Sequence, residues 1–441
     1  MSSIPKEQLA QIRGEMLQTL LRQVAALACS VGAAVVVARL LGPEGNGRCA
    51  ASVMIALGLS QFLELGLPQA NSHLLARSFS LRQAATANLA AWSTLSLVGL
   101  LGAGIAIRWY GQDLLPGVPI ELQVLGLASF PLVLLQAMLV SMLRGLRDFR
   151  RYNRVLLVSP AATLVLVIFW CGTQGLGAAG ALWAFLVGQL LGIGATLVSL
   201  RPHWVSATME TTALESYWRR CADFGLKSHG VACLSFLSER TGFFLVNLFL
   251  LPAAAGVYAI AAQISDRLLM LSLAASTVLL PRLSTLEDPA PRAALTARFA
   301  GLAMGLSALV CVLLAGLARP VIGLLFGDRY LEAVPVLQCL LVAVPAVNLA
   351  RVLATDLAAR GRPELNLHPA AGTTLLNVAL GWMLIPHGGL MGGAVATTVG
   401  YCAGAMLTVW TYLRVTRSPQ TAGSPDFEAT VPVGSSNDRA D

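Results

Sequence analysis

The chain has 441 residues, of which 56% are hydrophobic and only 12% charged, and its mean hydropathy is +0.71. Because a soluble domain carries about 25% charged residues, this composition excludes an ordinary soluble enzyme and a disordered protein. It is typical of an integral membrane protein. The net charge is +8. The basic residues interrupt apolar runs and form no single patch, so they do not indicate a nucleic-acid partner.

Twelve apolar segments are each long enough to cross a bilayer as a helix, which takes about 20 residues. We expect these spans at residues 17–41, 50–75, 84–107, 120–143, 154–171, 175–200, 222–250, 255–281, 297–325, 333–358, 365–386 and 388–413. The polar residues 1–16 and the uninterrupted apolar run after them argue against a cleaved signal peptide. The predicted fold is therefore an all-α integral membrane protein.

The longest polar interruption separates the sixth span from the seventh. We expect an N-terminal six-helix lobe over residues 1–200, a linker over 201–220, a C-terminal six-helix lobe over 221–413 and a disordered tail over 414–441. Similar features recur in both halves at offsets between 209 and 216 residues. They pair 175–181 with 389–394, 144–145 with 360–361, Pro131 with Pro345, and Gly47 with Gly256. A near-constant offset predicts two tandem lobes with a site between them.

The loops differ in charge on the two sides of the predicted membrane. One side holds Lys6, Arg13, Arg77, Arg82, Arg144, Arg147, Arg150, Arg151, Arg154, Arg201, Arg219, Arg220, Arg282, Arg292, Arg360, Arg362, Arg414 and Arg417. The other side holds only Arg39, Arg48, Arg108, Arg319 and Arg329. Since basic loops stay in the cytoplasm, both termini are expected there.

Several ionisable residues lie within the predicted spans, where a charge costs at least about 2.5–3.5 kcal/mol and normally faces the protein interior. The candidate substrate-binding residues of a central cavity are Arg267, Arg240, Arg351 and Arg22. The candidate ion-coupling or pairing carboxylates are Asp266, Glu239, Asp356 and Glu64. The guanidinium group keeps its charge and binds phosphate oxygens in a bidentate manner, so several arginines in one cavity would suit a pyrophosphate or an acidic sugar.

Each of these residues also has a structural interpretation. Arg22 and Glu64 lie near span ends, where a long side chain can reach the interface. Glu239 and Arg240 are adjacent, as are Asp266 and Arg267, and neighbours on a helix do not face each other. The two residues of each pair are therefore expected to lie in different surroundings. One alternative is a cross-helix ion pair, such as Glu239 with Arg267.

The sequence contains no recognisable catalytic or metal-binding motif. The five histidines are scattered, and the eight cysteines lie mostly in apolar runs without C-x-x-C spacing. We therefore expect neither enzymatic activity nor a metal or other cofactor, while coupling to Na⁺ or H⁺ stays open.

Short segments in a fixed order also resemble a known family. They are 38–47, 65–70, 254–259, 281–283, 325–330 and 359–363. These segments resemble bacterial polysaccharide exporters, the oligosaccharide-lipid flippases of the multidrug/oligosaccharidyl-lipid/polysaccharide (MOP) superfamily. The resemblance covers about residues 15–413.

This resemblance implies a two-lobed, twelve-helix fold like that of multidrug-and-toxin-extrusion (MATE) transporters, in the bacterial inner membrane. It implies movement of an undecaprenyl-pyrophosphate-linked O-antigen or exopolysaccharide repeat unit to the outer leaflet by alternating access. The segment 265–268 is similar to an Asp-Arg-Leu stretch of lipid II flippases, where the arginine serves a cationic cavity, which favours Arg267. The following segment 269–272 departs from that branch.

Other functions remain as alternatives. An ion-coupled multidrug exporter would share the fold and would need an unpaired carboxylate, for which Glu64 and Asp356 are the candidates. A non-transporting membrane component of glycan assembly is the third interpretation. The expected partners are the lipid-linked glycan, membrane lipids and other polysaccharide-assembly membrane proteins.

Overall fold

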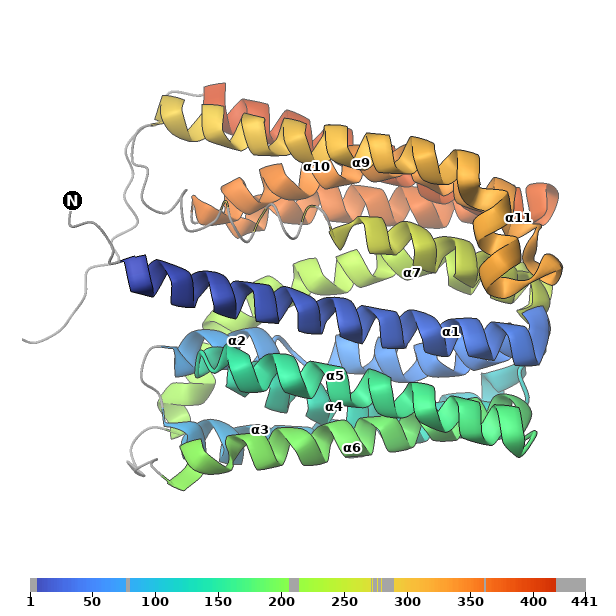
Figure 1. Cartoon of the computed structure of the whole chain (residues 1–441), viewed down its shortest axis with the longest axis horizontal. Coiled ribbons are helices and arrows are strands. Elements are labelled where there is room, and N and C mark those ends of the chain that lie inside the picture. Colours follow the sequence, from blue (N-terminus) through green and yellow to red (C-terminus); the bar gives the residue numbers. More distant parts are fainter. Residues whose placement is uncertain are drawn as a thin grey trace, which may run out of the picture.

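The computed structural model describes residues 6–76, 80–205, 214–270, 289–360 and 362–417, together with positions 272, 276 and 279. Within these ranges every regular element is a helix, and the long helices lie side by side as a bundle (Figure 1). The helices are α1 (Lys6–Leu63), α2 (Leu67–Leu75), α3 (Leu81–Leu114), α4 (Ile120–Gly145), α5 (Phe149–Val167), η1 (Ile168–Thr173), α6 (Gly177–Val205), α7 (Leu214–Leu268), α9 (Pro289–Phe326), η3 (Asp328–Tyr330), α10 (Ala333–Ala359), η4 (Pro363–Asn366) and α11 (Leu367–Arg417).

Three of these helices reverse direction. A straight helix as long as α1, with 58 residues, would extend about 87 Å, whereas the hydrocarbon core is about 30 Å thick. Non-helical backbone interrupts α1 at Gly42, α7 at Leu251 and α11 at Gly389. In Figure 1, α1 runs away from the N-terminus and then returns. Nine helices among the described residues are long and apolar enough to span a membrane. Three of them cross twice, so the predicted twelve-helix membrane fold is confirmed.

The reversals recur at the offsets found in the sequence. The kinks at Gly42 (φ 67°) and Leu251 (φ 69°) are 209 residues apart. Gly175 (φ 66°) and Gly389 (φ 58°) are 214 residues apart. Positive φ favours glycine, so its use at three of these four positions has a backbone reason. The division into two lobes agrees with this recurrence.

Helices enter the predicted linker from both ends. Helix α6 continues to Val205 and α7 begins at Leu214, so both enter the range 201–220. Residues 206–213 lie outside the described residues, as does the tail from 418 onward. The domain boundaries therefore stay a prediction.

At the end of the bundle where Gly42 and Leu251 lie, here called the kink face, the two halves meet backbone to backbone. A Cβ atom on Gly47 would lie 1.8 Å from the Pro252 carbonyl oxygen, and one on Gly256 would lie 2.0 Å from that of Pro43. The Asn46 side-chain amide also donates to the Gly256 carbonyl over 3.1 Å. Only glycine permits this approach, so the interface is closed at the kink face.

The opposite end, where α1 begins and Arg150 lies, is here called the N-terminal face. Near it the start of α7 packs into the first half. Tyr217 is fully buried there and accepts a hydrogen bond from Asn88 over 2.9 Å, and its own hydroxyl donates to Asn71. Asn71 also donates to Ser141 over 3.0 Å. A buried polar network therefore joins the linker end of α7 to helices α2, α3 and α4.

Candidate functional site

The reversal of α7 brings two charged pairs of the sequence together. Glu239 and Arg240 precede the kink, and Asp266 and Arg267 follow it. Glu239 lies about 18 Å along the helix from Leu251, at the rise of an α-helix, in a hydrocarbon core about 30 Å thick. Glu239 therefore lies near the middle of the predicted membrane, and Arg267, about 24 Å along the helix from Leu251, lies within the membrane towards its opposite side.

Two ion pairs form in this cluster. Arg240 Nη1 lies 3.2 Å from Asp266 Oδ2, and Arg351 Nη2 of α10 lies 2.7 Å from Glu239 Oε1. The expectation that adjacent residues split between partners is confirmed, because Glu239 faces α10 while Arg240 faces the returning half of α7. The alternative of a pair between Glu239 and Arg267 is wrong.

Arg267 differs from the other arginines of the cluster. It is exposed, and it has no hydrogen bond or ion pair with any residue that the structure describes. The three arginines outnumber the two carboxylates, so the cluster carries one excess positive charge. A positive group without a partner in a low-dielectric region attracts an anion.

The helix ends directly beside Arg267. Helix α7 stops at Leu268, and the fully buried Asn348 of α10 donates to the Leu268 carbonyl over 3.2 Å. The Asn348 Oδ1 atom accepts from the Ser272 backbone over 3.3 Å. Irregular backbone at membrane depth is tolerated only in protein or beside a cavity, and transporters use such breaks at their binding sites. No glycine or proline in the adjoining sequence predicts this break. Its one signal in the sequence is a polar asparagine within an apolar helix.

A cavity of about 220 Å³ opens beside Glu239 and Arg351. Helices α7, α10 and α11 form its walls, with Ser235, Tyr401 and Asn366 among the lining residues. A second cavity of about 400 Å³ shares Arg351 and Asn366 with it. The sequence analysis did not single out Ser235, Tyr401 or Asn366, because isolated polar residues are common in membrane helices.

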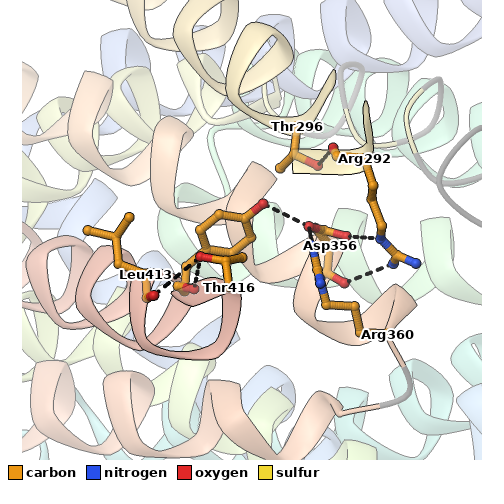
Figure 2. A network of polar contacts seen from close by, with 7 residues as sticks. Arg292, Thr296, Asp356, Arg360, Leu413 and Thr416 are labelled. Carbon is orange, nitrogen blue, oxygen red and sulfur yellow. Dashed lines mark hydrogen bonds and ion pairs between the residues drawn. The ribbon is translucent and has the colours of Figure 1, made fainter. Parts of the chain in front are cut away.

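Asp356 lies apart from this cluster in a network of its own (Figure 2). Its carboxylate has no exposed surface and lies 2.7 Å from Arg292 Nε and 3.0 Å from Arg360 Nη2. The Tyr412 hydroxyl donates to it over 2.9 Å. This network fastens α9, α10 and α11 to one another, and the carboxylate is fully paired. Asp356 is therefore not the unpaired carboxylate that an ion-coupled exporter needs.

The structure does not bring Glu64 and Arg22 to the cluster. Glu64 lies in the first half at the break between α1 and α2, where it is 8% exposed and accepts hydrogen bonds from Gln61 (3.2 Å) and Gln69 (3.3 Å). Arg22 donates to the Arg150 carbonyl over 3.4 Å at the N-terminal face. Five of the eight predicted site residues therefore come together.

The fold has solved counterparts. The lipid II flippase MurJ, in an inward closed conformation, is 13% identical with a TM-score of 0.72, covering 91% of this chain and 90% of that one. An inward-facing MATE family multidrug resistance transporter of the MOP superfamily is 15% identical with a TM-score of 0.73, covering 92% and 100%. A MOP superfamily transporter from Pyrococcus furiosus is 16% identical with a TM-score of 0.65, covering 91% and 94%. The chain therefore has the MOP transporter fold.

The comparison with curated proteins finds no match. The comparison with protein families finds one that covers most of the chain, described as polysaccharide biosynthesis protein, over residues 36–335. This range includes the kinks at Gly42 and Leu251 and the residues Glu239, Arg240, Asp266 and Arg267. The chain belongs to the polysaccharide biosynthesis protein family.

Proposed function

We propose that the protein is a flippase that moves an undecaprenyl-pyrophosphate-linked oligosaccharide across the bacterial inner membrane. The observation that carries this proposal is Arg267, an arginine that has no partner among the described residues and lies within the membrane beside two ion-paired arginines. A permanently charged planar group matches phosphate oxygens, and a lone cation there needs an anionic ligand to offset its cost. The family and the fold agree with a transported glycan.

The distribution of basic residues supports the direction of transport. The N-terminal face holds the arginines of the α4–α5 connection, including Arg144, Arg147 and Arg150. Arg39 and Arg48 lie near the kink face, where Arg48 donates to the Gly117 carbonyl over 3.2 Å. Because basic loops stay in the cytoplasm, we assign the N-terminal face and both termini to that side.

The proposed mechanism is alternating access. The diphosphate and the sugars enter between the halves from the N-terminal face, and the excess charge of the arginine cluster holds the diphosphate. The polyprenyl tail stays in the lipid, since burying it in a polar cavity would gain nothing. Opening of the kink face and closing of the N-terminal face then release the glycan outward.

An ion-coupled multidrug exporter is the second candidate, and Glu64 is the observation that favours it. Its carboxylate is buried, and among the described residues its hydrogen-bond partners are two glutamines, with no ion pair. Such a carboxylate could exchange a proton or bind Na⁺ during transport. The excess of arginines around Arg267 favours an anionic cargo instead.

The test uses a strain that lacks the gene. Undecaprenyl-pyrophosphate-linked glycan and surface polysaccharide are quantified after complementation with the wild type, Arg267→Ala or Arg319→Ala. Arg319 is an exposed arginine near the kink face and serves as the matched control. We expect the lipid-linked glycan to accumulate with Arg267→Ala, inserted at wild-type level, and not with Arg319→Ala.

Normal export by Arg267→Ala would contradict the role of this arginine. Unchanged lipid intermediates in the deletion strain, with lost drug resistance, would instead identify the protein as an exporter of drugs.

A further inference from the structure

We propose that the cavity of about 220 Å³ between α7, α10 and α11 is a sugar subsite that holds the first monosaccharide of the lipid-linked glycan. This inference rests on the proposed function and deepens it, because it divides the cargo between two places. The diphosphate lies at Arg267, and the uncharged sugar ring lies in the cavity beside Arg351.

The lining of the cavity offers polar groups that have no hydrogen-bond partner among the described residues. The hydroxyl groups of Ser235 and Tyr401 make no hydrogen bond with the residues that the structure describes. Asn366 donates to the Ala354 carbonyl over 3.1 Å, while its Oδ1 atom is buried and unpaired. A buried polar atom without a hydrogen bond, such as Asn366 Oδ1, destabilises the empty cavity. A ligand with several hydroxyl groups both donates and accepts, so it would satisfy all three.

The charge of the cavity suits an uncharged ligand. Its two charged residues are Glu239 and Arg351, which already neutralise each other over 2.7 Å. One carboxylate oxygen and the remaining guanidinium N–H groups stay available, since the two side chains are 29% and 42% exposed. This pair can therefore bind hydroxyl or amide groups without requiring a charge on the ligand, whereas the unpaired Arg267 requires one.

The size and the walls of the cavity indicate a single sugar ring. Pockets for drug-sized ligands begin at about 300 Å³, and this cavity is smaller. Among its lining residues Tyr401 is the single aromatic, and Ala350, Ala354 and Ala405 form part of the wall, so it lacks the aromatic surface that an apolar drug would use. The second cavity of about 400 Å³ shares Arg351 and Asn366 with the first. It would accommodate the next sugars of the repeat unit.

The experiment measures binding to the full chain in lipid nanodiscs with four probes. They are undecaprenol, undecaprenyl diphosphate, and undecaprenyl diphosphate carrying either one N-acetylglucosamine or one glucose. We expect the better of the two glycolipids to bind about tenfold more tightly than the bare diphosphate, the gain of one or two satisfied hydrogen bonds.

The double variant Ser235→Ala/Tyr401→Phe should lose most of this advantage and keep the wild-type affinity for the bare diphosphate. The unchanged affinity also shows that the variant folds. Tyr110→Phe, at an exposed position of α3, is the matched control and should behave as the wild type.

The inference is overturned if the wild type binds bare and sugar-bearing diphosphates equally, or if the double variant weakens both to the same extent. Failure of the proposed function gives a different result. In that case no diphosphate binds more tightly than undecaprenol, and Arg267→Gln changes nothing.

Discussion

Replacing Asp356 by asparagine should strongly destabilise the C-terminal half. The carboxylate has no exposed surface, and the side chains of Arg292 and Arg360 are only 13% and 11% exposed. Removal of its charge leaves two buried guanidinium groups without a counter-charge. Breaking a buried pair by removing one partner costs about 3–5 kcal/mol. Because asparagine still offers one oxygen to the Tyr412 hydroxyl or to an arginine, we expect about 3 kcal/mol.

The free energy of unfolding would be measured in micelles by denaturant titration of wild type and variant. Glu364→Gln is the control, since its ion pair with Arg362 spans 3.7 Å between largely exposed side chains, and no measurable change is expected. The double variant Asp356→Asn/Arg360→Gln should recover part of the loss, because it removes one uncompensated charge. A loss below about 1 kcal/mol for Asp356→Asn would refute the reasoning that the two charges depend on this carboxylate.

Three further predictions concern other contacts. Gly47→Ala should lower the melting temperature, because its Cβ would meet the facing backbone of α7, whereas Gly305→Ala, in open space, should not. Tyr217→Phe should cost about 0.5–1.5 kcal/mol in unfolding, because Asn71 loses one buried donor and keeps the other, Asn88. Burial alone would raise the pKa of Asp148, but hydrogen bonds from the first turn of α5 and from α6 outweigh it and lower the pKa. The stabilising contribution of Asp148 should thus be complete above pH 3.8 and should be lost as the pH falls through the lowered pKa. In Asp148→Asn, the free energy of unfolding should depend less on pH in this range.

The twelve crossings could be predicted because the length of an apolar run reports directly on the thickness of the bilayer. The shape of the reversals could not. The predicted spans leave residues 42–49 between the first two helices, but the helix resumes directly after Gly42. Pro43 and Pro252 each follow a kink residue. A proline is tolerated there because the first turn of a helix needs no N–H donor.

The residue types of the candidate site were also predictable, because a charge inside a membrane segment is energetically costly and is therefore found mainly at functional positions. The partners were not. The rotation of α10 about its axis depends on packing over many residues. It places Arg351 against Glu239 and leaves Arg267 without a partner among the described residues. The break at Leu268 is equally hidden, because the group that stabilises it, Asn348, is 80 positions away in the chain.

The contact between Gly47 and Gly256 forms a pivot for opening and closing of the N-terminal face, and it has to separate when the kink face opens. The two glycines meet the facing backbone directly, and the side chains of Arg39 and Tyr330 add hydrogen bonds between the halves near the same end. The N-terminal face is about 30 Å away, so a rotation of roughly 10° about this point displaces the far ends of the helices by about 5 Å. A methyl group added at either glycine would shift the axis of this rotation and leave the arginine cluster intact. Its effect is therefore expected on the rate of transport, with little change in the affinity for the cargo.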